Sequence, residues 1–164
     1  MHFSNEFMKK SPLKIIKYPN DILRRKTQEV RVEELKDPKV KRLIFGMLET
    51  MKAEKGVGLA APQVGSNLRI CTIKIGEEAA VLINPRIKSS SRKKDVFEEG
   101  CLSFPGKFFQ VERPTKVKAQ ARNIEGEKIK IKASGLLARV LQHEIDHLDG
   151  ILVIDRAVKS KAKP

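Results

Sequence analysis

The stretch that decides the fold is residues 134–150, which reads SGLLARVLQHEIDHLDG. Apolar residues recur in it at helical spacing and form one stripe, made of Leu137, Leu141, Ile145 and Leu148. Ser134 is a suitable N-terminal cap, and Gly150 can end the helix. Leu136 and Val140 widen the apolar face. We therefore expect a helix that lies at the centre of the molecule.

This predicted helix contains the pattern HExxH, from His143 to His147. Residues four apart lie on one face of a helix, so both imidazoles can bind one metal ion while Glu144 lies beside it. A catalytic site of this kind uses three protein ligands and keeps one position open for water. The pattern alone also fits a helix with two surface or core histidines, so the third ligand decides between the readings.

The third ligand has to come from upstream. No Glu follows Glu144, which removes the thermolysin-like arrangement, and Val153 stands where metzincins have their third His. Cys101 is the candidate because it lies in EGCLSFPG (99–106), a segment of turn character, and an upstream carboxylate is the alternative. Cys71 lies in an apolar, strand-like stretch, so we interpret it as structural.

The remaining patterns predict a second helix and several strands. Residues 37–54 have helical apolar spacing, and Gly56 follows them. Alternating, β-branched stretches predict strands at residues 68–76, 80–85, 116–121 and 128–131, the last two antiparallel around Glu125-Gly126. The predicted fold class is α+β, with mixed antiparallel sheets surrounding a central helix that carries HExxH. We expect a flexible N-terminal extension at residues 1–12 and a single catalytic domain at residues 13–164.

The composition limits the partners and the location. The 34 Lys and Arg against 20 Asp and Glu give a net charge of +14, which attracts polyanions such as RNA or the ribosome surface. Aromatic residues make up only 5%, so a merely solvated basic surface is the alternative. We find no apolar stretch of membrane-spanning length and no signal peptide, and therefore expect a cytoplasmic location without a membrane partner.

Three motifs give the sequence a specific resemblance. GVGLAAPQ (56–63), EGCLS (99–103) and QHEIDH (142–147) occur in the order in which they occur in the peptide deformylase family, which the chain resembles from about Leu13 to Asp155. The resemblance implies a metal-dependent hydrolase that removes the N-terminal formyl group from formyl-methionyl nascent polypeptides and releases formate. It also implies a bacterial type of enzyme, which leaves an organellar location open.

The resemblance assigns roles to individual residues. It implies three metal ligands, which are Cys101, His143 and His147. It also implies that Glu144 is the general base, and that the side-chain amide of Gln63 and the backbone N–H of Leu102 bind the formyl oxygen. Glu99 is expected to pair with Arg113 and hold the loop that carries Cys101. One divalent ion per chain is expected, with Fe(II) as the native metal and Zn, Ni or Co as substitutes.

The substrate is expected to bind beside these residues. Gly56 and Gly58 allow the backbone to approach a peptide closely. An apolar pocket for the methionine side chain is implied, made of Val57, Phe97, Leu136 and Val140. Arg139 is expected at the pocket rim, with its alkyl stem on the substrate and its guanidinium in water. The competing hypotheses are a metalloprotease that uses HExxH and a basic module that binds RNA or the ribosome without catalysis.

Overall fold

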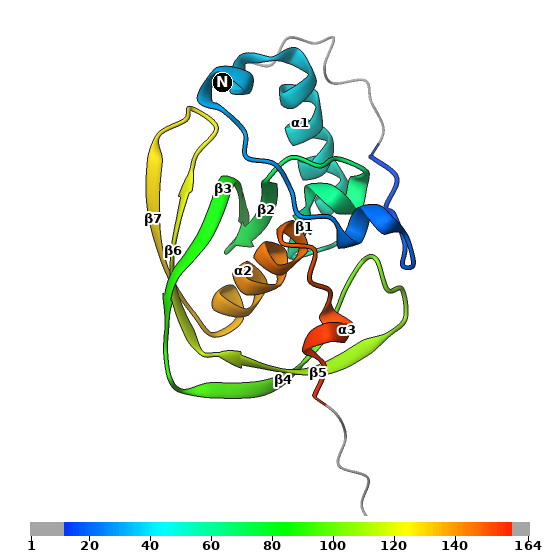
Figure 1. The fold of residues 1–164 in the computed structure, drawn as a ribbon, viewed down its shortest axis with the longest axis vertical. Coiled ribbons are helices and arrows are strands. Elements are labelled where there is room, and N and C mark those ends of the chain that lie inside the picture. The colour runs from blue at the N-terminus through cyan, green and yellow to red at the C-terminus, as the bar shows by residue number, and fades with distance from the viewer. Residues whose placement is uncertain (1–11, 159–164) are drawn as a thin grey trace, which may run out of the picture.

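The computed structural model describes residues 12–158 (Figure 1). The predicted N-terminal extension lies almost wholly outside these residues. Two main helices are present, α1 (Pro38–Ala53) and α2 (Gly135–Leu148), and a short α3 (Val153–Arg156) follows. No helix within residues 12–158 is both long enough and apolar enough to cross a bilayer.

Within the described residues, seven strands form two separate antiparallel sheets. They are β1 (Gly58–Ala60), β2 (Ile70–Ile75), β3 (Glu78–Ser90), β4 (Lys94–Gly100), β5 (Phe108–Pro114), β6 (Lys116–Arg122) and β7 (Lys128–Ser134). The larger sheet has the order β1-β2-β3-β6-β7, and β4 pairs with β5 to form the smaller one. The chain is therefore α+β with antiparallel sheets, as its sequence predicts.

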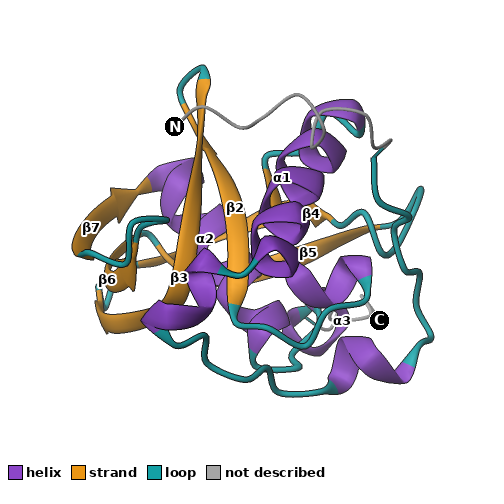
Figure 2. Cartoon of the chain, turned by 90° about the horizontal axis from the view of Figure 1, so that it is seen from above, coloured by secondary structure: helices purple, strands orange, loops and turns teal. Residues whose placement is uncertain are grey.

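The larger sheet packs against a helix on each face. Alternate residues of β2 and β6, such as Cys71 and Val117, join Leu141 and Ile145 of α2 in one buried cluster. The opposite face, with Ile70 of β2, packs against α1. In the view of Figure 2, β3 and β2 lie between the β6–β7 pair and α1. The face turned away from α2 therefore stays uncovered by α1 at β6 and β7.

The smaller sheet closes the other side of α2. Figure 1 shows α2 between the larger sheet and the β4–β5 pair, and α2 contacts strands of both sheets. A two-stranded sheet is only marginally stable on its own, so its contacts with α2 matter for its position. The loop between β4 and β5 begins at Cys101, directly after Gly100 ends β4.

Several local expectations need correction. The sequence did not reveal β1 or the β4–β5 pair, and β3 is longer than the expected strand at residues 80–85. Ser134 occupies the N-cap position of α2, but its side chain makes no capping hydrogen bond. The backbone of Gly135, with φ of 57°, is instead held by a hydrogen bond from its N–H to the carbonyl of Thr115.

Candidate metal centre and active site

The helix α2 places both histidines of HExxH toward the loop after β4. The Sγ of Cys101 lies 3.3 Å from the Nε2 of His147, and the rings of His143 and His147 meet edge to face with centroids 4.9 Å apart. One ligand atom from each of these three residues lies within 4.8 Å of the other two. Ligands about 2.0 to 2.3 Å from a tetrahedral ion lie about 3.5 Å apart, so the three donors fit one ion.

The soft and imidazole donors of this cluster suit a transition metal rather than calcium or magnesium. His143 has its Nδ1 on Glu99, at 2.9 Å from Oε2, so its Nε2 is the nitrogen free to bind a metal ion. Burial alone lowers the pKa of His143, but its hydrogen bonds with Cys101 and Glu99 outweigh this and raise the pKa to about 10. A metal ion needs the neutral imidazole, so its binding must release this proton.

Glu144 lies beside the two histidines and has a raised pKa. It is 4% exposed, and among the described residues nothing hydrogen-bonds to its Oε2. Burial raises the pKa of Glu144 to about 7, against the opposing effect of His143. A carboxyl group with such a pKa can both accept and return a proton near neutral pH, which is what a general acid–base residue needs.

Gln63 is fixed by neighbours that the sequence did not reveal. Its Oε1 accepts a hydrogen bond from the N–H of Ala60 at 2.9 Å, which orients the amide. Its Nε2 donates to the Oγ of Ser103 at 3.2 Å and lies 3.6 Å from the Sγ of Cys101. Ser103 in turn donates to the carbonyl of Ile16 at 2.8 Å. The amide N–H group therefore points toward the metal centre. The sequence predicted a role for Gln63 but not the hydrogen bonds that orient it.

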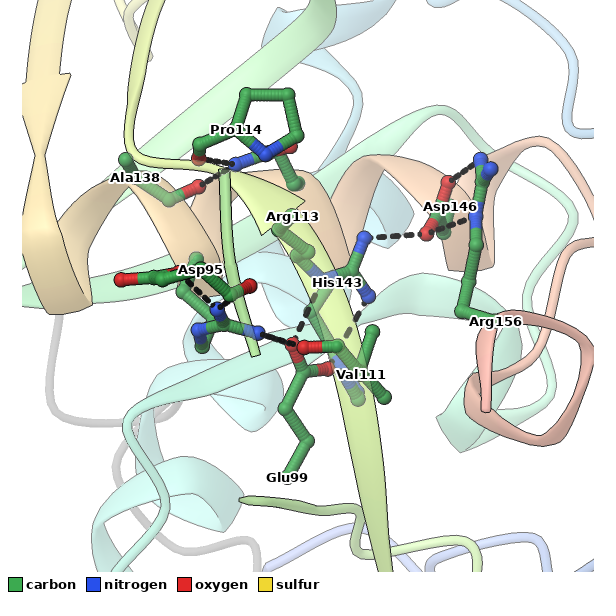
Figure 3. Close-up of polar contacts among 11 residues, drawn as sticks. Asp95, Glu99, Val111, Arg113, Pro114, Ala138, His143, Asp146 and Arg156 are labelled. Atoms are coloured by element: carbon green, nitrogen blue, oxygen red, sulfur yellow. Dashed lines mark hydrogen bonds and ion pairs between the residues drawn. The ribbon is translucent and has the colours of Figure 1, made fainter. Parts of the chain in front are cut away.

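Behind His143 lies a buried network of ion pairs (Figure 3). Arg113 donates two hydrogen bonds to Glu99, at 2.7 and 3.1 Å, and a third to Asp146 at 2.7 Å. Glu99 is 6% and Arg113 is 3% exposed, so their pair is not a solvated one. Asp146 also accepts hydrogen bonds from Arg156 of α3. The sequence motif contains Asp146, but only the fold reveals its partners.

The expected position of the Arg139 guanidinium is wrong. Arg139 is 7% exposed, and its guanidinium is in the buried network rather than in water. It donates to Glu99, to the carbonyl of Val111 and to both the carbonyl and the carboxylate of Asp95. Since β4 and β5 were not predicted, the acceptors that draw this side chain inward could not be predicted either.

A cavity of about 620 Å³ unites most of the expected site. Its walls include all of the expected substrate-contacting residues, which are Gly56, Val57, Gly58, Phe97, Leu136, Arg139 and Val140. Gln63, Glu99, Cys101, Leu102, His143 and Glu144 also line it, whereas buried His147 and Arg113 lie behind the wall. The structure therefore brings the expected residues together around the candidate metal centre.

The rim of this cavity is apolar and exposed. Val57, Phe97 and Leu136 are 47%, 60% and 65% exposed, so core packing does not explain them. Val140 also lines the cavity but differs, because it is 8% exposed and belongs to the buried cluster around α2. Phe108, which the sequence did not single out, also lines the cavity and is 65% exposed. Exposed apolar side chains grouped around a cavity are typical of a binding site.

A larger cleft lies elsewhere and has different chemistry. Its volume is about 840 Å³, and charged side chains such as Lys26, Arg69 and Glu112 dominate its walls. Arg113 and Asp146 line it too, so it lies behind the ion-pair network. None of the three clustered metal donors lines it. Chemistry rather than volume therefore identifies the smaller cavity as the candidate active site.

Comparison with known proteins gives one consistent family. The family model described as polypeptide deformylase matches residues 12–163. Peptide deformylase of Dictyoglomus thermophilum is 49% identical over 138 residues, which cover 84% of this chain and 89% of that protein. Peptide deformylase 1B, chloroplastic/mitochondrial, of Arabidopsis thaliana is 44% identical over 151 residues, covering 89% of this chain.

The chain is shorter than its plant relative and similar in fold to solved structures. The chain spans about half the length of the plant relative, 54%. A structure of class I type b peptide deformylase from Acinetobacter baumannii with Met-Ala-Ser bound has a TM-score of 0.84 at 35% identity. The match covers 89% of this chain and 98% of that one. The similarity therefore extends over the fold as well as the sequence.

Proposed function

The chain belongs to the polypeptide deformylase family, and we propose on this basis that it hydrolyses the N-terminal formyl group of formyl-methionyl nascent polypeptides and releases formate. The observation that carries the proposal is the grouping of Cys101, His143 and His147 at the wall of a cavity that Glu144 lines and that has an apolar rim. The α2 helix, which supplies three of these four residues, is on this view the central scaffold of the catalytic domain.

We propose one divalent ion per chain, held by Cys101, His143 and His147. Fe(II) is the expected native metal, and Zn, Ni or Co can substitute because a thiolate and two imidazoles accept all of them. When bound, such an ion supplies Lewis acidity, which makes water more acidic and polarises the formyl oxygen. Glu99 fixes the ring of His143, and Arg113 fixes Glu99, so the ligand set is preorganised.

The residues of the chain supply the proton transfers and the binding of the oxyanion. With a pKa of about 7, Glu144 accepts a proton from the attacking water and returns it to the departing amine. The amide of Gln63, oriented by Ala60 and Ser103, donates to the formyl oxygen as negative charge develops on it. The N–H of Leu102 is the proposed second donor. These fixed dipoles favour the tetrahedral transition state over the planar substrate.

The cavity rim explains a preference for an N-terminal methionine. The flexible thioether side chain of methionine suits an apolar surface such as Phe97, Leu136 and Val57. β1 is an edge strand of the larger sheet, and it starts at Gly58 on the cavity wall. An extended peptide can therefore add to this edge through backbone hydrogen bonds. The Met-Ala-Ser held by the Acinetobacter baumannii enzyme agrees with such a ligand.

Formate release tests the proposal directly. Protein loaded with Fe(II) without oxygen is incubated with formyl-Met-Ala-Ser and, as a control, with acetyl-Met-Ala-Ser. We expect formate and intact Met-Ala-Ser from the first peptide, and little product from the second. Cleavage within the tripeptide would favour the metalloprotease hypothesis. Absence of formate from fully loaded protein would contradict the proposed function.

Domain organisation and location follow as parts of this proposal. We propose that residues 13–164 act as one catalytic domain, because the clusters that hold the site draw on segments from Ile15 to Val153. A formylated nascent chain is the substrate wherever translation starts with formyl-methionine. The cytoplasm of a bacterium is therefore the proposed location, and an organelle remains the alternative that the plant relative suggests.

We propose that the basic surface also attracts ribosomal RNA. On the outer face of β6 and β7 the exposed residues include five lysines, which are Lys116, Lys118, Lys128, Lys130 and Lys132. Neither strand contains an acidic residue. Lys118 and Lys132 are direct cross-strand partners. Two like charges in this position destabilise the strand pair unless an anion neutralises them. A groove of about 500 Å³ on this part of the sheet includes Ser89 and Ser90 among its walls.

A further inference from the structure

Arg139 is a buried residue to which the proposed chemistry assigns no role. It lies one helical turn before His143 in α2, and its side chain is 8% exposed. Nη1 donates to the Oε1 of Glu99 at 2.8 Å and to the carbonyl of Val111 at 2.9 Å. Nη2 donates to the carbonyl of Asp95 at 3.1 Å and to its carboxylate. Each terminal nitrogen of the guanidinium is therefore engaged twice.

The carboxylate of Glu99 is the point where these contacts meet the metal centre. Its Oε1 accepts from both Arg113, at 2.7 Å, and Arg139. Its Oε2 accepts from Arg113 at 3.1 Å and faces the Nδ1 of His143 at 2.9 Å (Figure 3). With Oε1 held from two sides, the carboxylate cannot turn without breaking an ion pair. Its second oxygen therefore stays directed at the imidazole.

We propose that Arg139 is a positioning residue that acts through Glu99 on His143 and thereby tightens metal binding at the three-donor cluster. This inference rests on the proposed function, because it presumes that Cys101, His143 and His147 hold a metal ion. The partners of a ligating histidine fix its tautomer and its orientation, and their loss typically lowers metal affinity about 10- to 100-fold. Arg139 acts on the histidine indirectly, through Glu99, so its loss should fall at the lower end of this range.

The same side chain also controls one wall of the cavity. Through Asp95 and Val111 it ties β4 and β5 to α2, and its Cζ lies 5.8 Å from the centre of the Phe97 ring. Phe97 belongs to β4 and lines the cavity. A role as a clamp for the β4–β5 pair is therefore the structural alternative. That role would change stability and substrate binding, but it predicts no specific change in metal affinity.

The planar fork of arginine explains why a lysine would not serve. The acceptors lie on two sides of the guanidinium, so two nitrogens at fixed separation are needed to reach them together. A lysine keeps the positive charge but offers a single nitrogen. Arg139→Lys therefore separates geometry from charge, whereas Arg139→Met removes both and keeps an unbranched apolar side chain.

The experiment measures metal affinity and stability in parallel. Wild type, Arg139→Met, Arg139→Lys and Asp95→Asn are titrated with Co(II) against a competing chelator, followed by the absorption of the thiolate-bound ion. Arg69→Met is the matched control, because Arg69 is similarly buried, at 5% exposure, and bonds to Pro85, Leu148 and Asp149 rather than to Glu99 or the three donors. The Tm of each metal-free protein, and kcat and KM at saturating metal, are measured on the same samples.

We expect Arg139→Met to lose about 10-fold or more in Co(II) affinity, with Arg139→Lys only partly restored. Asp95→Asn should stay within about 2-fold of wild type, because it leaves the contact with Glu99 intact. Arg69→Met should lower Tm without weakening metal binding. Unchanged affinity in Arg139→Met, or an equal loss in Arg69→Met at the same Tm, would overturn the inference alone. A wild type that binds no metal would overturn the proposed function as well.

Discussion

Cys101 and Glu144 face one cavity, yet they should fail in different ways when they are replaced. Cys101→Ala removes a thiolate charge and one of three metal bonds, so metal content and formate release should fall together. Glu144→Ala removes the proton carrier and leaves all three donors in place. Its metal content should stay near that of wild type while turnover falls by roughly 10²- to 10⁴-fold or more. Metal analysis and formate release on the same samples check both.

The pair also tests the assignment of roles within HExxH. If Glu144→Ala lost its metal as completely as Cys101→Ala, Glu144 would be a ligand or a structural support. The general-base assignment would then have to be given up. The stability of Glu144→Ala should change little or rise, because a buried carboxyl group without a hydrogen-bond partner on Oε2 is not optimised for folding.

Glu99 should make the protein sensitive to acid. Burial alone would raise its pKa, but hydrogen bonds from His143 and Arg113 outweigh burial and lower the pKa from 4.5 to about 2. Its contribution to stability is therefore complete above about pH 4.5 and is lost as the pH falls toward 2. Since one pKa unit corresponds to about 1.4 kcal/mol, the full shift sets an upper limit on the order of 3 kcal/mol, which solvent screening reduces.

Urea unfolding of the metal-free protein between pH 5 and 2 measures this effect, with Glu99→Gln as the comparison. The variant should be less stable at pH 5 and should lose less stability on acidification, because it has no carboxyl group to protonate at this position. Parallel pH profiles for the two proteins would contradict the assigned role of Glu99.

At the level of residues, the sequence predicted what local patterns encode. The spacing of His143 and His147 followed from helix geometry, and elimination of downstream ligands favoured Cys101. The partners that fix these residues could not be predicted in the same way. Ser103 and Asp146 bond to residues about 30 to 90 positions away, so only the tertiary fold reveals their roles. The inward turn of Arg139 was missed for the same reason.

Among the elements, the contact between β1 and α2 explains a glycine in the first motif. A Cβ atom at Gly58 would lie 2.8 Å from the Cδ and 2.9 Å from the Cγ of Glu144. Gly58→Ala should therefore displace the Glu144 carboxylate, lower kcat by about 10-fold or more, and leave the metal bound. The sequence explained this glycine by the approach of the substrate, whereas the structure adds the approach of the general base.

Kinetics of the double variant decide whether Gly58→Ala acts through Glu144. In a Glu144→Ala background the carboxylate is absent, so adding Gly58→Ala should have almost no further effect on kcat. Independent, multiplicative losses would instead indicate that the added methyl group disturbs the substrate or the strand. Metal content has to be equal in all four proteins for the comparison to hold.

Elements with strong periodicity were predicted well, and elements without it were missed. The stretches that became α1, α2, β2, β6 and β7 alternate or repeat clearly, and their ends agree within a few residues. In β4 and β5 most side chains are exposed, and only Glu99, Val111 and Arg113 are buried. Two of these three are charged, so the pair has no apolar face that a pattern could reveal. Its contacts with the rest of the fold combine ion pairs to α2 with the burial of Val111.

For the whole molecule, the distribution of charge predicts where polyanions bind. Replacing Lys118, Lys130 and Lys132 with Gln should weaken cosedimentation with ribosomes and reduce its salt dependence. Each lost phosphate contact lowers the slope of log K against log salt by about 0.7 to 0.9. The control removes the same charge from exposed positions of α1, with Lys39, Arg42 and Lys52 replaced by Gln. Equal effects of the two triple variants would mean that net charge alone drives the attraction.

The two cysteines differ so strongly in solvent access that the reactivity of their thiols can report how many sites hold a metal ion. Cys71 is 0% exposed in β2, and burial raises its pKa well above the ordinary value, so a thiol reagent should not reach it in the folded chain. Cys101 lines the open cavity and would be masked by a metal ion. An anaerobic thiol titration should thus give one reactive group per metal-free chain, none when loaded and two after denaturation. Two reactive groups in the native metal-free protein would contradict this expectation. If only one reacts, the number of thiols that a chromogenic reagent detects per chain measures the fraction of metal-free sites in a preparation.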